Sequence, residues 1–150
     1  MISQIPPFAH GFEYIRTDGA WPFVLTADVH VRFDLPLFGN VSFRDKTGRE
    51  WARFVGPVLI IREDYAWDGP TCAPKLRSAM LASLVHDCLY QFLFTDGMRC
   101  RITKEDADVA LYDIMRLHGS WLRGMFYFAV KMLGSAYLKD RNNVHSVVLP

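Results

Sequence analysis

The sequence predicts an α+β fold in which a small antiparallel β-sheet precedes three helices, the first two forming an antiparallel pair. Residues 1–64 carry stretches of alternating apolar and polar side chains, which is typical of half-buried strands. Residues 75–138 carry apolar side chains at spacings of three and four, which is typical of amphipathic helices. One glycine and two prolines interrupt residues 65–74, so this segment is expected to be a loop between the two regions.

Length and composition indicate one domain, with residues 139–150 as a tail that begins with five polar residues. The chain has 150 residues, half of them apolar, and its net charge of +1 gives no electrostatic argument for binding nucleic acid. Three cysteines are too few for a disulfide framework or a zinc site. We expect no membrane-spanning segment, because no window holds about 18 uncharged apolar residues. This cysteine content favours synthesis in a reducing cytoplasm. The first residues do not show the pattern of a secretion signal.

The strands are predicted from alternation and turn residues. Every second residue from Phe23 to Phe33 is apolar, so these side chains lie on one face, which predicts a single strand. Val41–Arg44 and Glu50–Phe54 flank the turn Asp45–Gly48, which predicts a hairpin. Val58–Arg62 is a further, mostly apolar strand.

The helices are predicted from apolar spacing and from their end signals. The first helix is expected from about Lys75 to Phe94. Thr103 followed by Asp106 resembles a capping box, which predicts a second helix over Lys104–Leu117. A third helix is expected from Trp121 to about Leu138, after the helix-ending Gly119.

Polar side chains on the first helix need partners. His86 and Tyr90 are four residues apart and share one face, whereas Asp87 points about 100° away. Burying such groups costs several kcal/mol unless each is hydrogen-bonded. We therefore predict that Asp108, on the second helix, lies within hydrogen-bond reach of His86. Asp68, in the loop before the first helix, either belongs to a plain connector or points back toward His86 and Asp87.

Several of these motifs together resemble a phage and prophage family known as "domain of unknown function 1353". Members of that family show a D-x-A-S-x-P-like loop, an H-D-x-L-Y helix and an A-D pair, in this order. The corresponding residues here are Trp67–Pro74, Ala82–Tyr90 and Ala107–Asp108, followed by Gly119. The resemblance implies a virion-associated protein, either a structural component of the tail or an assembly factor. Its implied partners are other phage structural proteins, and its implied locations are the host cytoplasm and then the virion.

The same helices are similar to those of phospholipases A2, which carry H-D-x-x-Y on one helix and an A-D pair on the next. This resemblance implies an esterase acting on a lipid or another ester, with His86 as the base that deprotonates water. It further implies that Asp108 orients the imidazole, that Tyr90 donates to Asp108, and that Asp87, with Asp68, binds calcium. The chain differs in its glycine-poor loop and in Leu89, where secreted members have a half-cystine.

Two other interpretations stay open at this point. His86, Asp87, Tyr90 and Asp108 could instead form a purely structural network that joins two helices. A nucleophile pair of Cys72 and His86 is conceivable at a helix N-terminus, although no third orienting residue accompanies it.

The third helix has more apolar surface than one buried face requires. One face carries the stripe Leu122, Met125, Phe126, Ala129, Met132, Leu133, Ala136 and Tyr137. Trp121 and Phe128 lie off that face, among charged residues. We predict that at least one of these two rings is exposed on the isolated chain and is covered by a neighbouring subunit.

Overall fold

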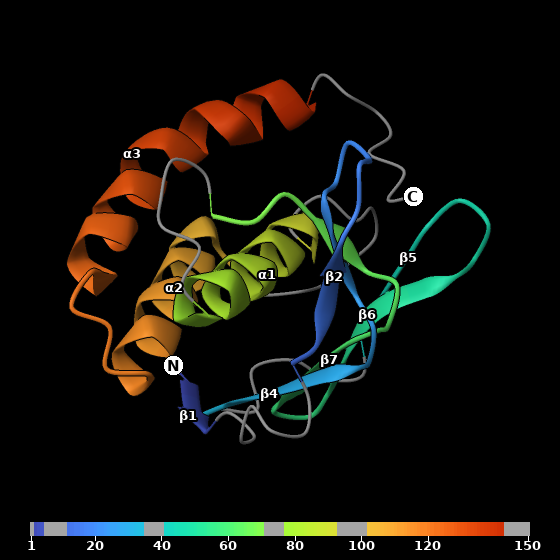
Figure 1. Cartoon of the computed structure of the whole chain (residues 1–150), viewed down its shortest axis with the longest axis horizontal. Helices are drawn as coiled ribbons and strands as arrows, with labels where there is room; N and C mark the ends of the chain where they lie inside the picture. The colour runs from blue at the N-terminus through green and yellow to red at the C-terminus, as the bar shows by residue number, and fades with distance from the viewer. Residues whose placement is uncertain (1, 5–11, 35–40, 71–76, 93–101, 143–150) are drawn as a thin grey trace.

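The computed structural model describes residues 2–4, 12–34, 41–70, 77–92 and 102–142, and it gives side chains for those up to residue 132 except 2–4 and 92. Strands fill the N-terminal half of the chain and helices fill the C-terminal half (Figure 1). The predicted α+β class is therefore confirmed. Within these residues the strands form two antiparallel sheets rather than one.

The larger sheet has five strands in the order β1-β4-β7-β6-β5. These strands span Ile2–Gln4 (β1), Val29–Phe33 (β4), Val58–Ile61 (β7), Glu50–Val55 (β6) and Val41–Arg44 (β5). Every neighbouring pair is antiparallel. The predicted hairpin is confirmed as β5–β6, and its turn is closed by the Asp45 side chain, which accepts from the backbone N–H groups of Thr47 and Arg49.

The smaller sheet has the order β2-β3-β8 and corrects two predictions. Its strands are Tyr14–Arg16 (β2), Phe23–Leu25 (β3) and Ala66–Trp67 (β8). The single strand expected over Phe23–Phe33 is therefore wrong, because β3 and β4 lie in different sheets. The expected loop 65–74 is wrong at its start, because β8 pairs with β3.

A bend between β3 and β4 separates the two sheets. The Asp28 carboxylate accepts the Glu63 backbone N–H at 2.8 Å and pairs with Arg62 at 2.9 Å, which holds the chain at this point. The apolar alternation continues through Ala27, but that residue is only half-buried. Alternation alone therefore does not reveal the bend.

The helices are α1 (Arg77–Phe92), α2 (Lys104–Leu117) and α3 (Arg123–Asn142). The bounds predicted for α2 are confirmed, as is its capping box at Thr103. The ends predicted for the first helix, about Lys75 and Phe94, lie outside the described residues. The third helix begins two residues later than predicted and runs past Leu138, so residues 139–142 are helical rather than tail. Polar residues without Gly or Pro do not stop a helix, which explains this error.

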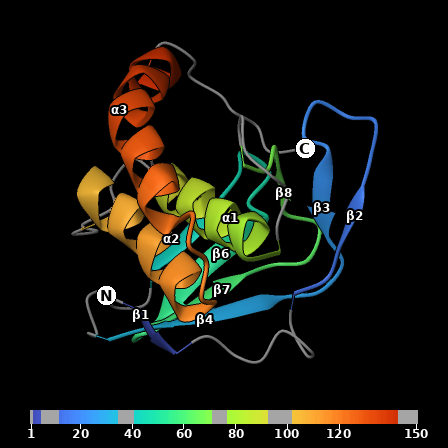
Figure 2. The same cartoon turned by 60° about the vertical axis from the view of Figure 1, so that its left-hand side comes forward.

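The helix α1 is the central element of the core. It lies between the sheets and α2, and α1 and α2 run in opposite directions (Figures 1 and 2). Trp67 of β8 donates its indole N–H to the Ser83 hydroxyl of α1 at 3.2 Å. On the other side, α3 packs on α2, where the rings of Tyr112 and Tyr127 lie 5.7 Å apart. Almost every side chain from Ala79 to Gln91 is buried as a result.

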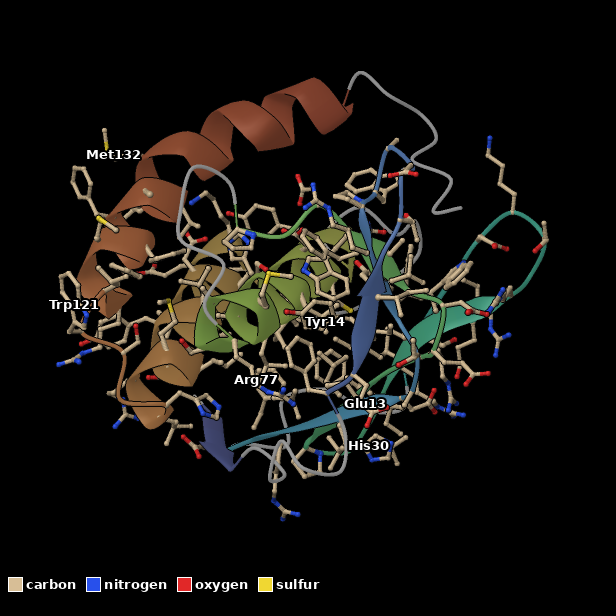
Figure 3. The ribbon with its side chains drawn as sticks, in the orientation of Figure 1. Glu13, Tyr14, His30, Arg77, Trp121 and Met132 are labelled. Carbon is tan, nitrogen blue, oxygen red and sulfur yellow. The ribbon has the colours of Figure 1, made fainter. Side chains whose placement is uncertain are left out.

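Of the apolar stripe predicted for the third helix, Leu122 and Phe126 are buried, but Met125 and Met132 are exposed, so the single buried face that the sequence predicts is wrong at these two residues. The predicted exposure of Trp121 and Phe128 on the isolated chain is confirmed, at 83% and 66%. Trp121 points away from α1 and α2 (Figure 3). That a neighbouring subunit covers these rings stays a prediction.

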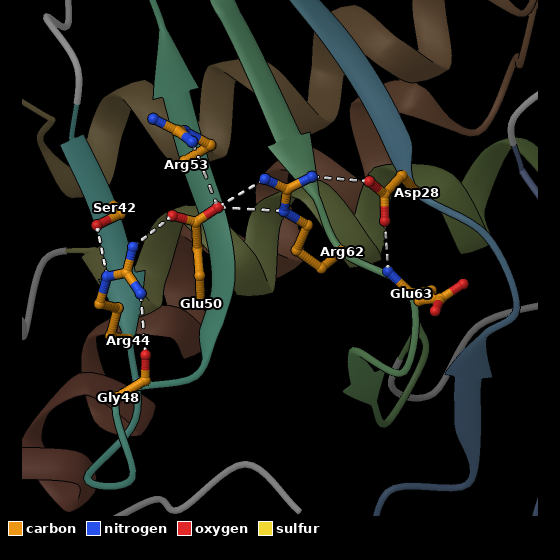
Figure 4. A network of polar contacts seen from close by, with 8 residues as sticks. All are labelled: Asp28, Ser42, Arg44, Gly48, Glu50, Arg53, Arg62 and Glu63. Atoms are coloured by element: carbon orange, nitrogen blue, oxygen red, sulfur yellow. Dashed lines mark hydrogen bonds and ion pairs between the residues drawn. The ribbon is translucent and has the colours of Figure 1, made fainter.

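An ion-pair network covers the polar side of the larger sheet (Figure 4). Glu50 pairs with Arg62 at 2.7 Å and with Arg44 at 2.9 Å, and Arg62 also pairs with Asp28. Arg53 of β6 lies on the same side, 3.8 Å from Glu50, and the next residue, Phe54, points to the opposite side and is buried. The sheet is thus polar on one face and packs its other face into the core.

Candidate functional site

The polar side chains of α1 and α2 meet at Asp108. His86 Nε2 lies 2.8 Å from Asp108 Oδ1, so the predicted contact is confirmed. The Tyr90 hydroxyl donates to the same oxygen at 2.8 Å. The structure therefore brings together three of the residues predicted for the site, two from α1 and one from α2. A fourth residue, Lys104 of α2, also contacts Asp108, and we refer to His86, Tyr90, Lys104 and Asp108 as the Asp108 network.

Helical spacing explains how α1 presents two groups to one carboxylate. Residues four apart lie one turn above each other, and the rings of His86 and Tyr90 are indeed 4.1 Å apart between centroids. On α2, the capping box fixes the first turn: the Thr103 hydroxyl accepts the Asp106 N–H, and the Asp106 carboxylate accepts the Thr103 N–H. Asp108 follows directly after this fixed turn.

Lys104 completes the Asp108 network and was not predicted from the sequence. Its ammonium group donates to Asp108 Oδ2 at 2.5 Å, one helical turn before the carboxylate. The i, i+4 spacing of a basic and an acidic residue on one helix is the signal that could have identified it. Both oxygens of Asp108 therefore have donors.

The network is buried, and its charges compensate one another. Asp108 is 2% exposed and His86 is 6% exposed. Burial alone would raise the pKa of Asp108, but the hydrogen bonds from His86, Lys104 and Tyr90 outweigh it and lower that pKa. Burial alone would lower the pKa of His86, but Asp108 and Asp87 outweigh it and raise that pKa. The folded state thus favours an imidazolium beside a carboxylate.

The second ring nitrogen of His86 faces another carboxylate. Nδ1 lies 3.6 Å from Asp87 Oδ1, and the Asp87 side chain is about one-fifth exposed. Two carboxylates therefore flank the ring, one at each nitrogen, and both favour the protonated imidazole. Burial and the neighbouring Asp108 raise the pKa of Tyr90, so its phenol stays a neutral donor.

Asp68 is exposed, in the loop after β8. Within the described residues, no three His, Cys, Asp or Glu side chains form a group that could hold a metal ion, so Asp68, His86 and Asp87 do not form one. Calcium takes six to eight oxygen ligands. The described side chains do not by themselves supply such a ligand set, and we derive no step through a metal.

The proposed cysteine nucleophile, Cys72, lies outside the described residues. The cysteine that follows Asp87, Cys88, is fully buried in the core. Burial raises the pKa of its thiol, so this group is an inert core residue rather than a nucleophile.

Comparison with known proteins identifies no family for the chain. No protein-family model matches it, and neither the curated proteins nor the solved structures contain a significant match. The resemblances to the phage family and to phospholipases A2 remain predictions from the sequence. Of the helices described, none is long and apolar enough to cross a membrane.

Proposed function

We propose that the chain is a structural component or assembly factor of a phage particle, and that the Asp108 network joins α1 to α2 rather than catalysing a reaction. The phage context is supported by the sequence resemblance. The non-catalytic role is supported by the geometry of the network. Other phage structural proteins are the partners that this proposal implies.

One observation carries the non-catalytic role: the network is complete within the chain. Asp108 accepts from three donors, and both ring nitrogens of His86 face carboxylates. A general base needs a neutral imidazole with a lone pair directed at water. Here Asp108 holds Nε2, and the Asp87 carboxylate lies 3.6 Å from Nδ1, at the position that such a water would occupy. A complete buried network of this kind fixes the arrangement of two helices.

Replacing His86 by asparagine tests the proposal. The change removes the group between Asp108 and Asp87, so we expect the free energy of unfolding to fall by about 1–3 kcal/mol. His30→Asn is the matched control, because His30 is exposed on β4 and its loss should change stability by less than about 0.5 kcal/mol. Denaturant unfolding of the three proteins measures both effects, and the parent chain should not hydrolyse phospholipids or simple esters.

The opposite pattern would refute the structural role. In that case the parent hydrolyses an ester, and His86→Asn abolishes the activity while leaving the unfolding midpoint unchanged.

An ester hydrolase is the second candidate, favoured by the orientation of the His86 ring. Asp108 holds Nε2, which directs the Nδ1 edge toward the partly exposed Asp87. In this reaction Nδ1 would accept a proton from water, the water oxygen would bond to the ester carbonyl carbon, and the alcohol would leave with a proton. Tyr90 and Asp108 would orient the ring. Calcium at Asp87 is part of this second proposal only, and repeating the hydrolysis assay with and without calcium tests it.

A further inference from the structure

In the part of the chain that the structure describes, no helix covers the outer face of the larger sheet. Figure 4 shows this face from outside, with the helices behind the strands. His30 of β4 is exposed and points away from the helices (Figure 3). Because side chains alternate along each strand, the outward side chains of β4, β7 and β6 form rows that cross the sheet.

One row of this face is paired within the chain, and the two rows beside it are not. The paired row is the ion-pair network around Glu50, in which acids and arginines alternate. The register of the strands gives the two other rows, each with one residue from β4, β7 and β6. Their members, which we call the Arg32 patch, are His30, Ile60 and Arg53 in one row and Arg32, Val58 and Val55 in the other.

The two arginines of the Arg32 patch have little compensation for their charge. Arg32 is exposed and has no hydrogen bond or ion pair, not even with the nearby Asp34. Arg53 lies 3.8 Å from Glu50, but that carboxylate already pairs more closely with two other arginines. The Nε of Arg53 is buried without a hydrogen-bond partner. Both guanidinium groups therefore keep donors for an acceptor outside the described chain.

Apolar side chains lie between these two arginines. Val55 is 43% exposed, and Val58 and Ile60 are half-buried. Arg32 neighbours Val58 across the strands, and Arg53 neighbours Ile60. An apolar centre flanked by arginines is typical of protein interfaces, in which arginine is enriched and contributes much of the binding energy.

The chemistry of the patch favours carboxylates on a protein over a nucleic acid or a membrane. A guanidinium group binds a carboxylate through two parallel hydrogen bonds. Nucleic acids require a longer track of basic groups, or exposed aromatic rings on which bases stack, and the Arg32 patch has neither. Anionic membranes attract clusters of about four to eight lysines or arginines. The adjacent carboxylates of Asp28 and Glu50 would also repel an extended polyanion.

We propose that the Arg32 patch is the binding surface for an acidic segment of another protein. One carboxylate of that segment binds Arg32 and a second binds Arg53, while an apolar side chain between them packs on Val58 and Ile60. Two strand spacings and two residues along a strand separate the arginines, so their Cα atoms lie about 12 Å apart. Two acidic residues four apart in an extended segment span about 13 Å, which fits this separation. The inference does not depend on the role of the Asp108 network.

An NMR titration of the full chain with the peptide Glu-Ser-Val-Ser-Glu, blocked at both ends, tests the proposal. In the extended peptide both carboxylates and the valine lie on one face. At low salt we expect shifts confined to β4, β6 and β7, with a dissociation constant of about 1 mM, which suits so small a ligand. The uncharged peptide Gln-Ser-Val-Ser-Gln should cause no shifts.

Charge reversal tests which residues bind the peptide. Arg32→Glu should weaken binding at least about fivefold, because it replaces attraction by repulsion, and it should leave the melting temperature unchanged, since Arg32 has no partner in the chain. Arg16→Glu is the matched control: Arg16 is exposed on β2, in the other sheet, and the change alters the net charge equally. This variant should bind the peptide within about twofold of the parent.

Three results would overturn the proposal. The first is a titration in which no shifts occur, or in which they map to elements other than β4, β6 and β7. The second is equal weakening by Arg16→Glu and Arg32→Glu, which would mean general electrostatic attraction. The third is tighter binding of the same face to a single-stranded DNA oligonucleotide or to phosphatidylglycerol vesicles than to the peptide.

Discussion

At the scale of single residues, His86 makes the stability of the protein depend on pH. Its pKa is higher in the folded state than the ordinary value of 6.5, because Asp108 and Asp87 outweigh burial. Its stabilising contribution is therefore complete below about pH 6.5 and is lost as the pH rises through the raised pKa. Asp108 has a lowered pKa, so its contribution is present above its ordinary value of 3.8 and is lost as the pH falls through the lowered pKa.

We expect the parent to lose stability from pH 6.5 upward relative to His86→Asn, which lacks the titrating ring. Unfolding free energies of both proteins between about pH 5 and 9 measure the difference. If the two curves run parallel across this range, His86 is not held as an imidazolium by its neighbours.

The sequence predicts most of the Asp108 network because its spacing is local. His86 and Tyr90 share a helix face by periodicity alone, and apolar surroundings require a partner such as Asp108. Lys104 was missed, since a surface lysine in a first helical turn is ordinarily solvated. The alternative in which Asp68 points back at His86 depended on the path of a loop, which spacing does not determine.

At the scale of elements, Gly69 sets the direction of the chain directly after β8. Its φ of +77° is one that other residues rarely adopt, and a Cβ there would lie 2.8 Å from the Phe23 ring and 3.6 Å from the Met80 sulfur. Gly69→Ala combines backbone strain with a clash in the core, so we expect a loss of about 2–4 kcal/mol.

Gly56→Ala is the matched control for this prediction. Gly56 also has a positive φ, +56°, but a Cβ there would meet nothing within 4 Å. It should therefore show only the strain, about 1 kcal/mol. Equal losses in the two variants, measured by thermal or denaturant unfolding, would mean that close packing at Gly69 does not determine the path of the chain.

Prediction of the elements succeeded where signals are local and failed where pairing is distant. The hairpin β5–β6 and the helix α2 have their turn and cap residues within the segment itself. The break between β3 and β4 instead depends on Arg62 and Glu63, more than thirty residues away, which bind Asp28. The pairing of β8 with β3 likewise joins two segments that are far apart in the sequence.

At the scale of the whole molecule, α1 connects the parts. It packs against β8 through Trp67 and Ser83, and it joins α2 through the Asp108 network. The other side of α2 carries α3, along which Phe128 and Met132 are exposed. The packed centre therefore places these apolar side chains on the outside of the molecule.

The central claim is that His86 and Asp108 stabilise the fold as a pair. A double-mutant cycle with His86→Asn, Asp108→Asn and the combined variant, followed by denaturant unfolding, measures their coupling directly. We predict a coupling of about 1–3 kcal/mol, because the two groups share one buried hydrogen bond and opposite charges. Additive effects, within about 0.5 kcal/mol, would contradict the claim.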